Sequence, residues 1–296
     1  MKKIFSSFLF ACLFIAISCS LQKKYFSAPL SDLGHIDFVL DSADFFAFRE
    51  DSFLNRDFGA MFIDTTEIQG KPSYEMYLAG QEGFLHINLD KGYWQGREGG
   101  GAMIFHTRFP DKFDSLIFAW KQYYPDSLYQ KLLQMKDFEV GEVAIHHKKD
   151  SLSPVKPSFY PVFVSFSAGG YRNWGIPDTA ISKGITMKQF VDTWQLPLKE
   201  KLFKKVTALH VQVTENELRE METALKTMDY KKEKNSFIHA FNPAVHYQVT
   251  SENKIPKYTK IEIELSKPVA EKSFDIGTTY RFSMKGTKLE IVLKQL

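Results

Sequence analysis

The sequence predicts an α+β protein in which one strand–helix–strand unit occurs twice. Two observations carry this prediction. An alternating apolar run that begins with a histidine leads into a helical pattern at 34–48, and the same succession recurs at 209–225. A second pair of alternating runs, 84–89 and 288–293, follows the first pair downstream. The order of the four segments predicts a duplicated module with a candidate site between its copies.

The chain begins with the pattern of a targeting segment. Lys2 and Lys3 precede an apolar run at 4–17 that is too short to cross a membrane as a mature helix. The run leads into the letters AISC at 16–19. These letters resemble the lipobox of bacterial lipoproteins, whose cysteine is acylated and becomes the new N-terminus. A plain secretory peptide cut nearby, or a buried N-terminal helix, is the alternative.

The lipobox resemblance implies a signal peptide at 1–18, lipidation of Cys19 and a polar tether at 19–33. It implies a protein held by lipid in the bacterial cell envelope, and by resemblance to sorting rules Ser20 favours the outer membrane, facing the periplasm. Processing removes or modifies both cysteines of the chain, so we expect no disulfide and a fold that rests on its core. The nearly equal numbers of basic and acidic residues, 38 and 35, give no indication of a nucleic-acid partner.

The first unit opens with a strand and a helix. His35 and Asp37 alternate with apolar residues, which is the period of a half-buried strand, so both side chains lie on one face. Asp41 and Ser42 are placed to cap a helix at 43–50 whose phenylalanines give it an apolar inner face. A helix laid over a sheet is the simplest interpretation.

Further strands complete this unit, at 58–64, 73–78 and 84–89. In the last of them His86 lies on the face opposite the apolar residues, as His35 does in the first strand. The glycine-rich segment at 96–101 lacks the Lys-Ser/Thr ending of a phosphate-binding loop, so we interpret it as a turn.

The middle of the chain predicts a helix and three strands, at 111–123, 102–105, 141–147 and 160–166. The letters SFSAG at 165–169 match a nucleophile elbow only in part, because the first glycine is missing, which argues against a serine hydrolase. The aromatic segment at 169–175 is a loop that could act either as a lid or as a packed surface turn.

The second unit restarts at His210 and Gln212, which alternate with valines. Thr214 and Glu217 fit a capping box, and apolar residues at helical spacing predict a helix that ends near Asp229. Strands are expected at 245–249, 259–265, 279–284 and 288–293. In the last strand Glu290 lies on the polar face, where it takes the place that His86 has in the first unit.

This arrangement resembles the vicinal oxygen chelate superfamily, which includes glyoxalase I, extradiol dioxygenases and bleomycin-resistance proteins. The segment from His35 to Asp41 also resembles the HxxxxLD opening of glyoxalase-like bacterial proteins, in which a later strand carries an LEL-like triplet, here centred on His86. The resemblance covers 34–106 and 206–296, and the stretch between them matches less clearly.

The resemblance implies two paired βαβββ modules that form a curved mixed sheet with the helices on the outside. The first module would occupy 34–205, with an extended middle region, and the second 206–296. In the enzymes of this superfamily the first and last strands of the modules supply the metal ligands. Here those places are held by His35, His86, His210 and Glu290.

Three imidazoles and one carboxylate suit Zn²⁺, Fe²⁺, Ni²⁺ or Mn²⁺, with two positions open for a small molecule that has adjacent oxygens. Asp37 and Gln212 lie on the same faces and are candidates for a base or for orienting the ligands. The expected function is a metal-dependent lyase, isomerase or dioxygenase. The alternatives are a metal-free binding lipoprotein, with Trp94, Tyr171 and Trp174 lining its cleft, and a structural envelope protein.

Overall fold

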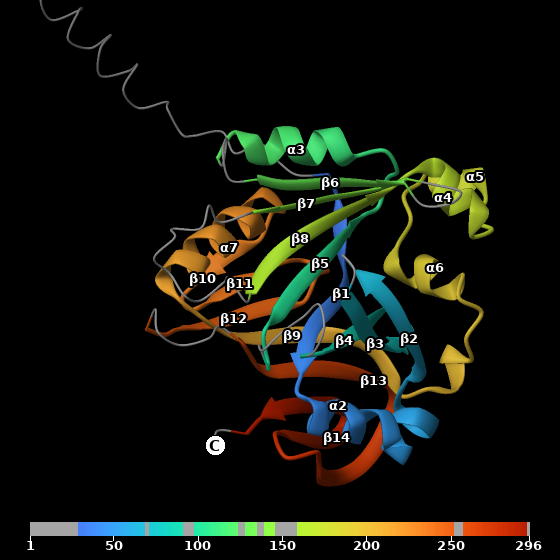
Figure 1. The fold of residues 1–296 in the computed structure, drawn as a ribbon, viewed down its shortest axis with the longest axis vertical. Helices are drawn as coiled ribbons and strands as arrows, with labels where there is room; N and C mark the ends of the chain where they lie inside the picture. The colour runs from blue at the N-terminus through green and yellow to red at the C-terminus, as the bar shows by residue number, and fades with distance from the viewer. Residues whose placement is uncertain are drawn as a thin grey trace, which may run out of the picture.

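The computed structural model describes residues 29–68, 71–90, 98–123, 128–134, 139–145, 159–251 and 257–294. The predicted signal peptide, Cys19, most of the tether and Trp94 lie outside these residues. The described chain forms two mixed sheets with helices at their margins, an α+β architecture as the sequence predicts (Figure 1). In the described part, no helix is long and apolar enough to span a membrane.

Sheet A has eight strands in the order β2-β3-β4-β1-β5-β8-β7-β6. It contains two successive βαβββ units, and in each unit the first and last strands pair in parallel. The first unit consists of β1 (Ser31–Leu40), α2 (Ser42–Glu50), β2 (Ala60–Ile68), β3 (Lys71–Gly80) and β4 (Gly83–Leu89), with a short π-helix, η1 (Leu54–Phe58), before β2. The second consists of β5 (Gly101–Thr107), α3 (Phe113–Lys121), β6 (Leu128–Gln134), β7 (Glu139–Ile145) and β8 (Phe159–Phe166). The antiparallel pair β1 and β5 joins them at the centre of the sheet.

Sheet B has six strands in the order β10-β11-β12-β9-β13-β14 and contains a third unit of the same topology. This unit consists of β9 (Phe203–Val213), α7 (Glu215–Thr227), β10 (Lys231–Glu233), β11 (Ser236–Ile238) and β12 (Ala244–Val249). Here too the first and last strands, β9 and β12, are parallel. A long hairpin of β13 (Lys257–Ile276) and β14 (Tyr280–Leu293) follows, and β13 lies antiparallel beside β9 as β5 lies beside β1.

The module boundaries drawn from the sequence therefore need correction. The segment 34–205 holds two βαβββ units rather than one, and these two units pair with each other through β1 and β5 within sheet A. The last strand of the third unit is β12, where His246 lies opposite His210. Glu290 lies on β14, outside that unit. The error arose because an alternating apolar run is common to every half-buried strand, so the likeness between 84–89 and 288–293 did not establish equivalent positions.

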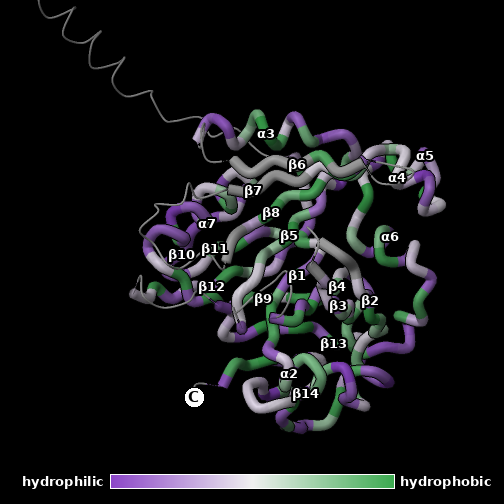
Figure 2. The backbone as a smooth tube through the Cα atoms, viewed as in Figure 1, coloured by the Kyte–Doolittle hydropathy of each residue, from purple (hydrophilic) through white to green (hydrophobic). Residues whose placement is uncertain are grey.

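The apolar faces of the two sheets share one core. Ile36 and Phe38 of β1 belong to the same buried cluster as Leu209 and Val211 of β9, together with side chains of α2 and α7. Each such buried side chain contributes roughly 1.5–3 kcal/mol of transfer free energy. In Figure 2, α7 is largely hydrophilic because only its inner stripe enters this core. The alternate residues of β1 and β9 must therefore face away from each other.

A helical segment between the second and third units covers the other face of sheet A, which we call the α6 face. The segment comprises α4 (Ala168–Asn173), α5 (Asp178–Ile181), α6 (Met187–Asp192) and η3 (Leu198–Glu200). Its Phe190 and Tyr171 join Phe84, Ile104 and Phe166 of the sheet in a second buried cluster. The aromatic segment at 169–175, expected to be a loop, is thus largely helix α4.

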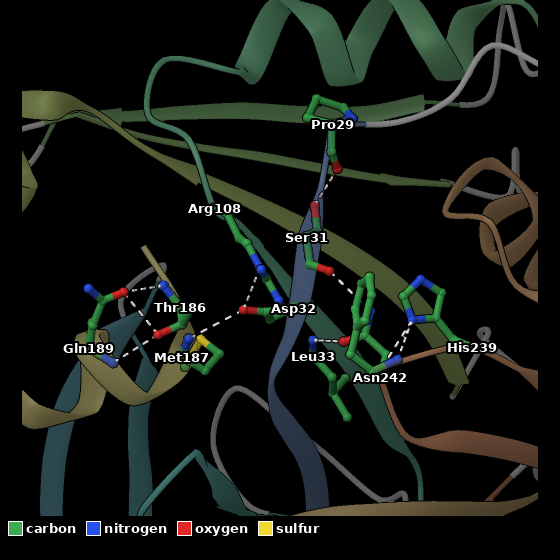
Figure 3. A network of polar contacts seen from close by, with 11 residues as sticks. Pro29, Ser31, Asp32, Leu33, Arg108, Thr186, Met187, Gln189, His239 and Asn242 are labelled. Carbon is green, nitrogen blue, oxygen red and sulfur yellow. Dashed lines mark hydrogen bonds and ion pairs between the residues drawn. The ribbon is translucent and has the colours of Figure 1, made fainter. Parts of the chain in front are cut away.

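Polar contacts join the start of β1 to α6 and the segment after β5 on one side, and to the segment before β12 on the other (Figure 3). The carboxylate of Asp32 accepts hydrogen bonds from Arg108 Nε and Nη2 at 2.9 and 2.7 Å, and from the backbone amide of Met187 at 3.4 Å. The side chain of Asn242 accepts from the amide of Leu33 at 2.8 Å and donates to the carbonyl of Ser31 at 3.1 Å. Strand β1 therefore begins at Ser31, inside the segment expected to be a tether.

Candidate metal centre on the α6 face

Two histidines converge on one aspartate beneath α6. His35 and Asp37 lie on β1 and His86 lies on β4, where the parallel register sets Asp37 opposite His86. The imidazole Nδ1 of His86 is 2.8 Å from Asp37 Oδ1, and Nε2 of His35 is 3.3 Å from the same oxygen. The strand alternation seen in the sequence places all three side chains on one face, and the parallel pairing brings them together.

A second carboxylate lies on the far side of His86. Glu75, on β3, places Oε2 at 3.2 Å from His86 Nε2, and the hydroxyl of Tyr77 donates to the same oxygen at 2.9 Å. Burial lowers the pKa of His86, but the charge of Asp37 and the hydrogen bonds to Asp37 and Glu75 outweigh it and raise that pKa to about 9. Without a metal, His86 is therefore an imidazolium between two carboxylates at neutral pH.

The same contacts act on the two acids. Burial raises the pKa of Asp37, but the charge of His86 and the hydrogen bonds from His35 and His86 hold it well below its usual range. Burial also raises the pKa of Glu75, but the hydrogen bond and the charge of His86 outweigh this effect and lower that pKa to about 2. Both carboxylates are thus ionised throughout the physiological range, which suits them to a cation.

A third histidine extends the cluster. His106 of β5 has Nε2 at 3.2 Å from His35 Nδ1, and its own Nδ1 is buried without a hydrogen-bond partner. Burial lowers the pKa of both imidazoles, and Asp37 only partly opposes this at His35. Gly34 makes room for the ring of His106, because a Cβ at position 34 would lie 2.4 Å from Cδ2 of that ring.

Aromatic rings close the site. Phe84 stacks on His35 with ring centroids 4.3 Å apart, and Tyr77 stacks on His86 at 4.4 Å. Trp194, which follows α6, packs against Phe84 at 4.8 Å. The side chains of His35, Asp37 and His86 keep only 14%, 12% and 13% of their surface exposed.

The other two predicted ligands lie elsewhere. His210 of β9 pairs with Glu262 of β13 at 2.7 Å, and Glu290 pairs with Lys260 at 3.1 Å. Lys260 also contacts Glu262 at 2.6 Å, so these side chains form one row of ion pairs on sheet B. Gln212 lies on the same face of β9.

The predicted site of four ligands is therefore not formed. The apolar residues that alternate with His35 and with His210 enter the same core, which directs the two histidines outward on opposite sides. The structure instead adds Glu75 and His106, which the sequence reasoning did not select. Glu75 shares its strand face with Ser73 and Tyr77, whereas His106 shares its face with the apolar Ala102 and Ile104. Only the pairing of β3 with β4 and of β5 with β1 shows that the two residues reach the cluster.

The donor set fits a divalent metal. One ligand atom each from His35, Asp37 and His86 lie within 4.8 Å of one another. Two imidazoles and a carboxylate are the set that holds non-haem iron and related divalent ions while leaving positions open. A metal-binding histidine also usually donates its other ring N–H to a carboxylate, and Glu75 is placed for this at His86.

Similarity to known proteins is confined to solved structures. No protein-family model and no curated protein matches the chain. Among solved structures it is similar to a methylmalonyl-CoA epimerase in complex with methylmalonyl-CoA and NH4+, with 15% identity and a TM-score of 0.28. The match covers 47% of this chain and 97% of the epimerase. The fold is of the βαβββ modular type.

Proposed function

We propose that this chain binds a divalent metal through His35, Asp37 and His86, and that it is a metal-dependent enzyme of the vicinal oxygen chelate type acting on a small molecule with adjacent oxygens. One observation carries the proposal: His35 Nε2 and His86 Nδ1 both point at a single oxygen of Asp37. The AISC letters at 16–19 support the further proposal that lipid on Cys19 anchors the protein in the bacterial cell envelope, at the outer membrane and facing the periplasm.

The surrounding residues prepare such a centre. When bound, a divalent metal supplies Lewis-acid polarisation of a ligand oxygen. Glu75 holds His86 through Nε2, which orients Nδ1 toward Asp37. His106 is hydrogen-bonded to His35 Nδ1, so it sets which nitrogen of His35 is free to bind. The aromatic cover leaves the side chains of the cluster mostly buried, which strengthens the electrostatic interactions between them.

Metal analysis of protein purified without chelator tests this proposal. We expect about one equivalent of a transition metal or zinc per chain, reduced to background in the His35→Ala and His86→Ala variants. His210→Ala is the matched control, because His210 also pairs with a carboxylate but lies on the other sheet. Metal-free wild-type protein, or equal metal content in all three variants, would refute the metal centre.

One observation favours a second candidate, a metal-free protein with a structural ion-pair cluster. His86 already has a carboxylate at each ring nitrogen, and aromatic side chains fill the α6 face. On this alternative the cluster stabilises sheet A and binds nothing. Nuclear magnetic resonance titration of His86 with and without added Zn²⁺ distinguishes the two, because a bound metal displaces the proton and removes its titration.

A further inference from the structure

A second group of acidic side chains lies away from the histidine cluster, where α2 begins. Asp41 caps α2, Asp44 lies in its first turn, and Glu98 precedes β5. One carboxylate oxygen from each residue lies within 4.8 Å of the others. The backbone holds Glu98 in place, since the amide of Gly99 donates to Val39 O at 2.8 Å.

Buried oxygens of Asp44, Glu98 and Tyr280 lack a hydrogen-bond partner. Asp44 is fully buried, and its Oδ1 accepts from the amide of Thr278 at 2.6 Å, but its Oδ2 has no hydrogen-bond partner. Oε1 of Glu98 and the hydroxyl of Tyr280, a residue that is 5% exposed, are likewise buried and unpartnered. An ionised carboxylate has no proton to donate, so two such oxygens side by side need either a shared proton or a cation between them.

The described residues supply little compensation. Within the described ranges no lysine, arginine or histidine forms an ion pair with any of the three acids. The positive end of α2 favours negative charge nearby, but it offers no hydrogen to Asp44 Oδ2. Burial raises the pKa of Glu98. A hydrogen bond from Thr279 opposes this, whereas the charges of Asp41 and Asp44 and a hydrogen bond with Asp44 add to the rise.

We propose that Asp41, Asp44 and Glu98 form a binding site for Ca²⁺. All the donors are oxygens, which hard cations prefer and which transition metals prefer less than imidazole or thiolate. Burial, and then the charges of Glu98, Asp44 and Asp41, raise the pKa of Tyr280. The site is independent of the histidine cluster, which supplies nitrogen donors from other positions.

Such an ion would link the two sheets. Asp44 belongs to the first unit of sheet A, whereas Thr278 lies in the turn between β13 and β14 of sheet B. That turn approaches so closely that a Cβ on Gly277, at a φ of +65°, would lie 1.9 Å from Asp44 Oδ1. Only glycine allows this approach, so Gly277 lets the β13–β14 turn contact Asp44.

Calorimetric titration of the chelator-treated full chain with CaCl₂ at pH 7.5 tests the proposal. We expect one Ca²⁺ per chain and a higher melting temperature in CaCl₂ than in chelator. Glu98→Gln and Asp41→Asn should each weaken binding at least about tenfold, because the affinity depends on the number of charged ligands. Asparagine keeps the cap of α2, so the second variant remains informative if the first does not fold.

Asp275→Asn is the matched control, because Asp275 lies in the β13–β14 hairpin near Thr278 but pairs with Arg281. It should leave Ca²⁺ binding unchanged, as should His35→Ala, which keeps this site separate from the histidine cluster. A wild-type protein with no calcium heat and no thermal shift would show that a shared proton alone satisfies these oxygens. Binding that survives both Glu98→Gln and Asp41→Asn would also overturn the assignment.

Discussion

The charge on His86 should make the stability of the metal-free protein fall with rising pH. In the folded state the pKa of His86 rises from 6.5 to about 9, because Asp37 and Glu75 outweigh the effect of burial. Since the folded pKa is the higher one, this contribution is fully present below pH 6.5 and is lost as pH rises through 9. A rise of this size corresponds to roughly 3 kcal/mol at about 1.36 kcal/mol per pKa unit.

Urea unfolding in chelator, at intervals from pH 6 to 10, measures this effect. Wild type should lose roughly 3 kcal/mol of unfolding free energy across that range, and His86→Gln should lose much less, because glutamine does not titrate. His210→Gln serves as the control, since the pKa of His210 is lowered by burial and its charge is lost at lower pH. If the unfolding free energy of wild type and of His86→Gln falls with the same slope between pH 6.5 and 9, the charge on His86 does not stabilise the folded protein.

Two further predictions concern the walls of the site. Gly34→Ala should lower the unfolding free energy by about 1–3 kcal/mol, because its methyl group would clash with the ring of His106, and equilibrium urea unfolding checks this. An unchanged midpoint would contradict the close approach. Trp194→Ala should remove part of the cover over Phe84 and speed the removal of bound metal by a chelator, measured against Phe241→Ala, whose 61% exposed ring lies outside the cover. Equal rates of metal loss in the two variants would refute the role of the cover.

Local signals in the sequence predict much of the fold. The caps at Asp41 and Thr214 locate the starts of α2 and α7, and both caps are present, each accepting the expected backbone hydrogen bond. Alternation also predicts the shared face of His35, Asp37 and His86. These features depend on periods of 3.6 and 2 residues, which are readable without knowing what packs against them.

The long-range features escaped prediction because they depend on strand pairing. The unit from β5 to β8 lacks a histidine-led opening like that at His35, so the sequence predicts it only as an extension of the first module. His106 and Glu75 reach the cluster only through the pairing of their strands with β1 and β4. The separation of His210 from His35 follows from the two sheets sharing one core, which an alternating pattern cannot show.

Cobalt substitution tests the central claim most directly. Co²⁺ added to metal-free protein should produce a visible absorption band that saturates at one equivalent, because His35, Asp37 and His86 supply nitrogen and oxygen ligands of a transition-metal site. The band should be absent from His86→Ala and present at full intensity in His210→Ala. A saturating band that persists in His86→Ala but disappears in His210→Ala, or no band in wild type, would contradict the proposed centre.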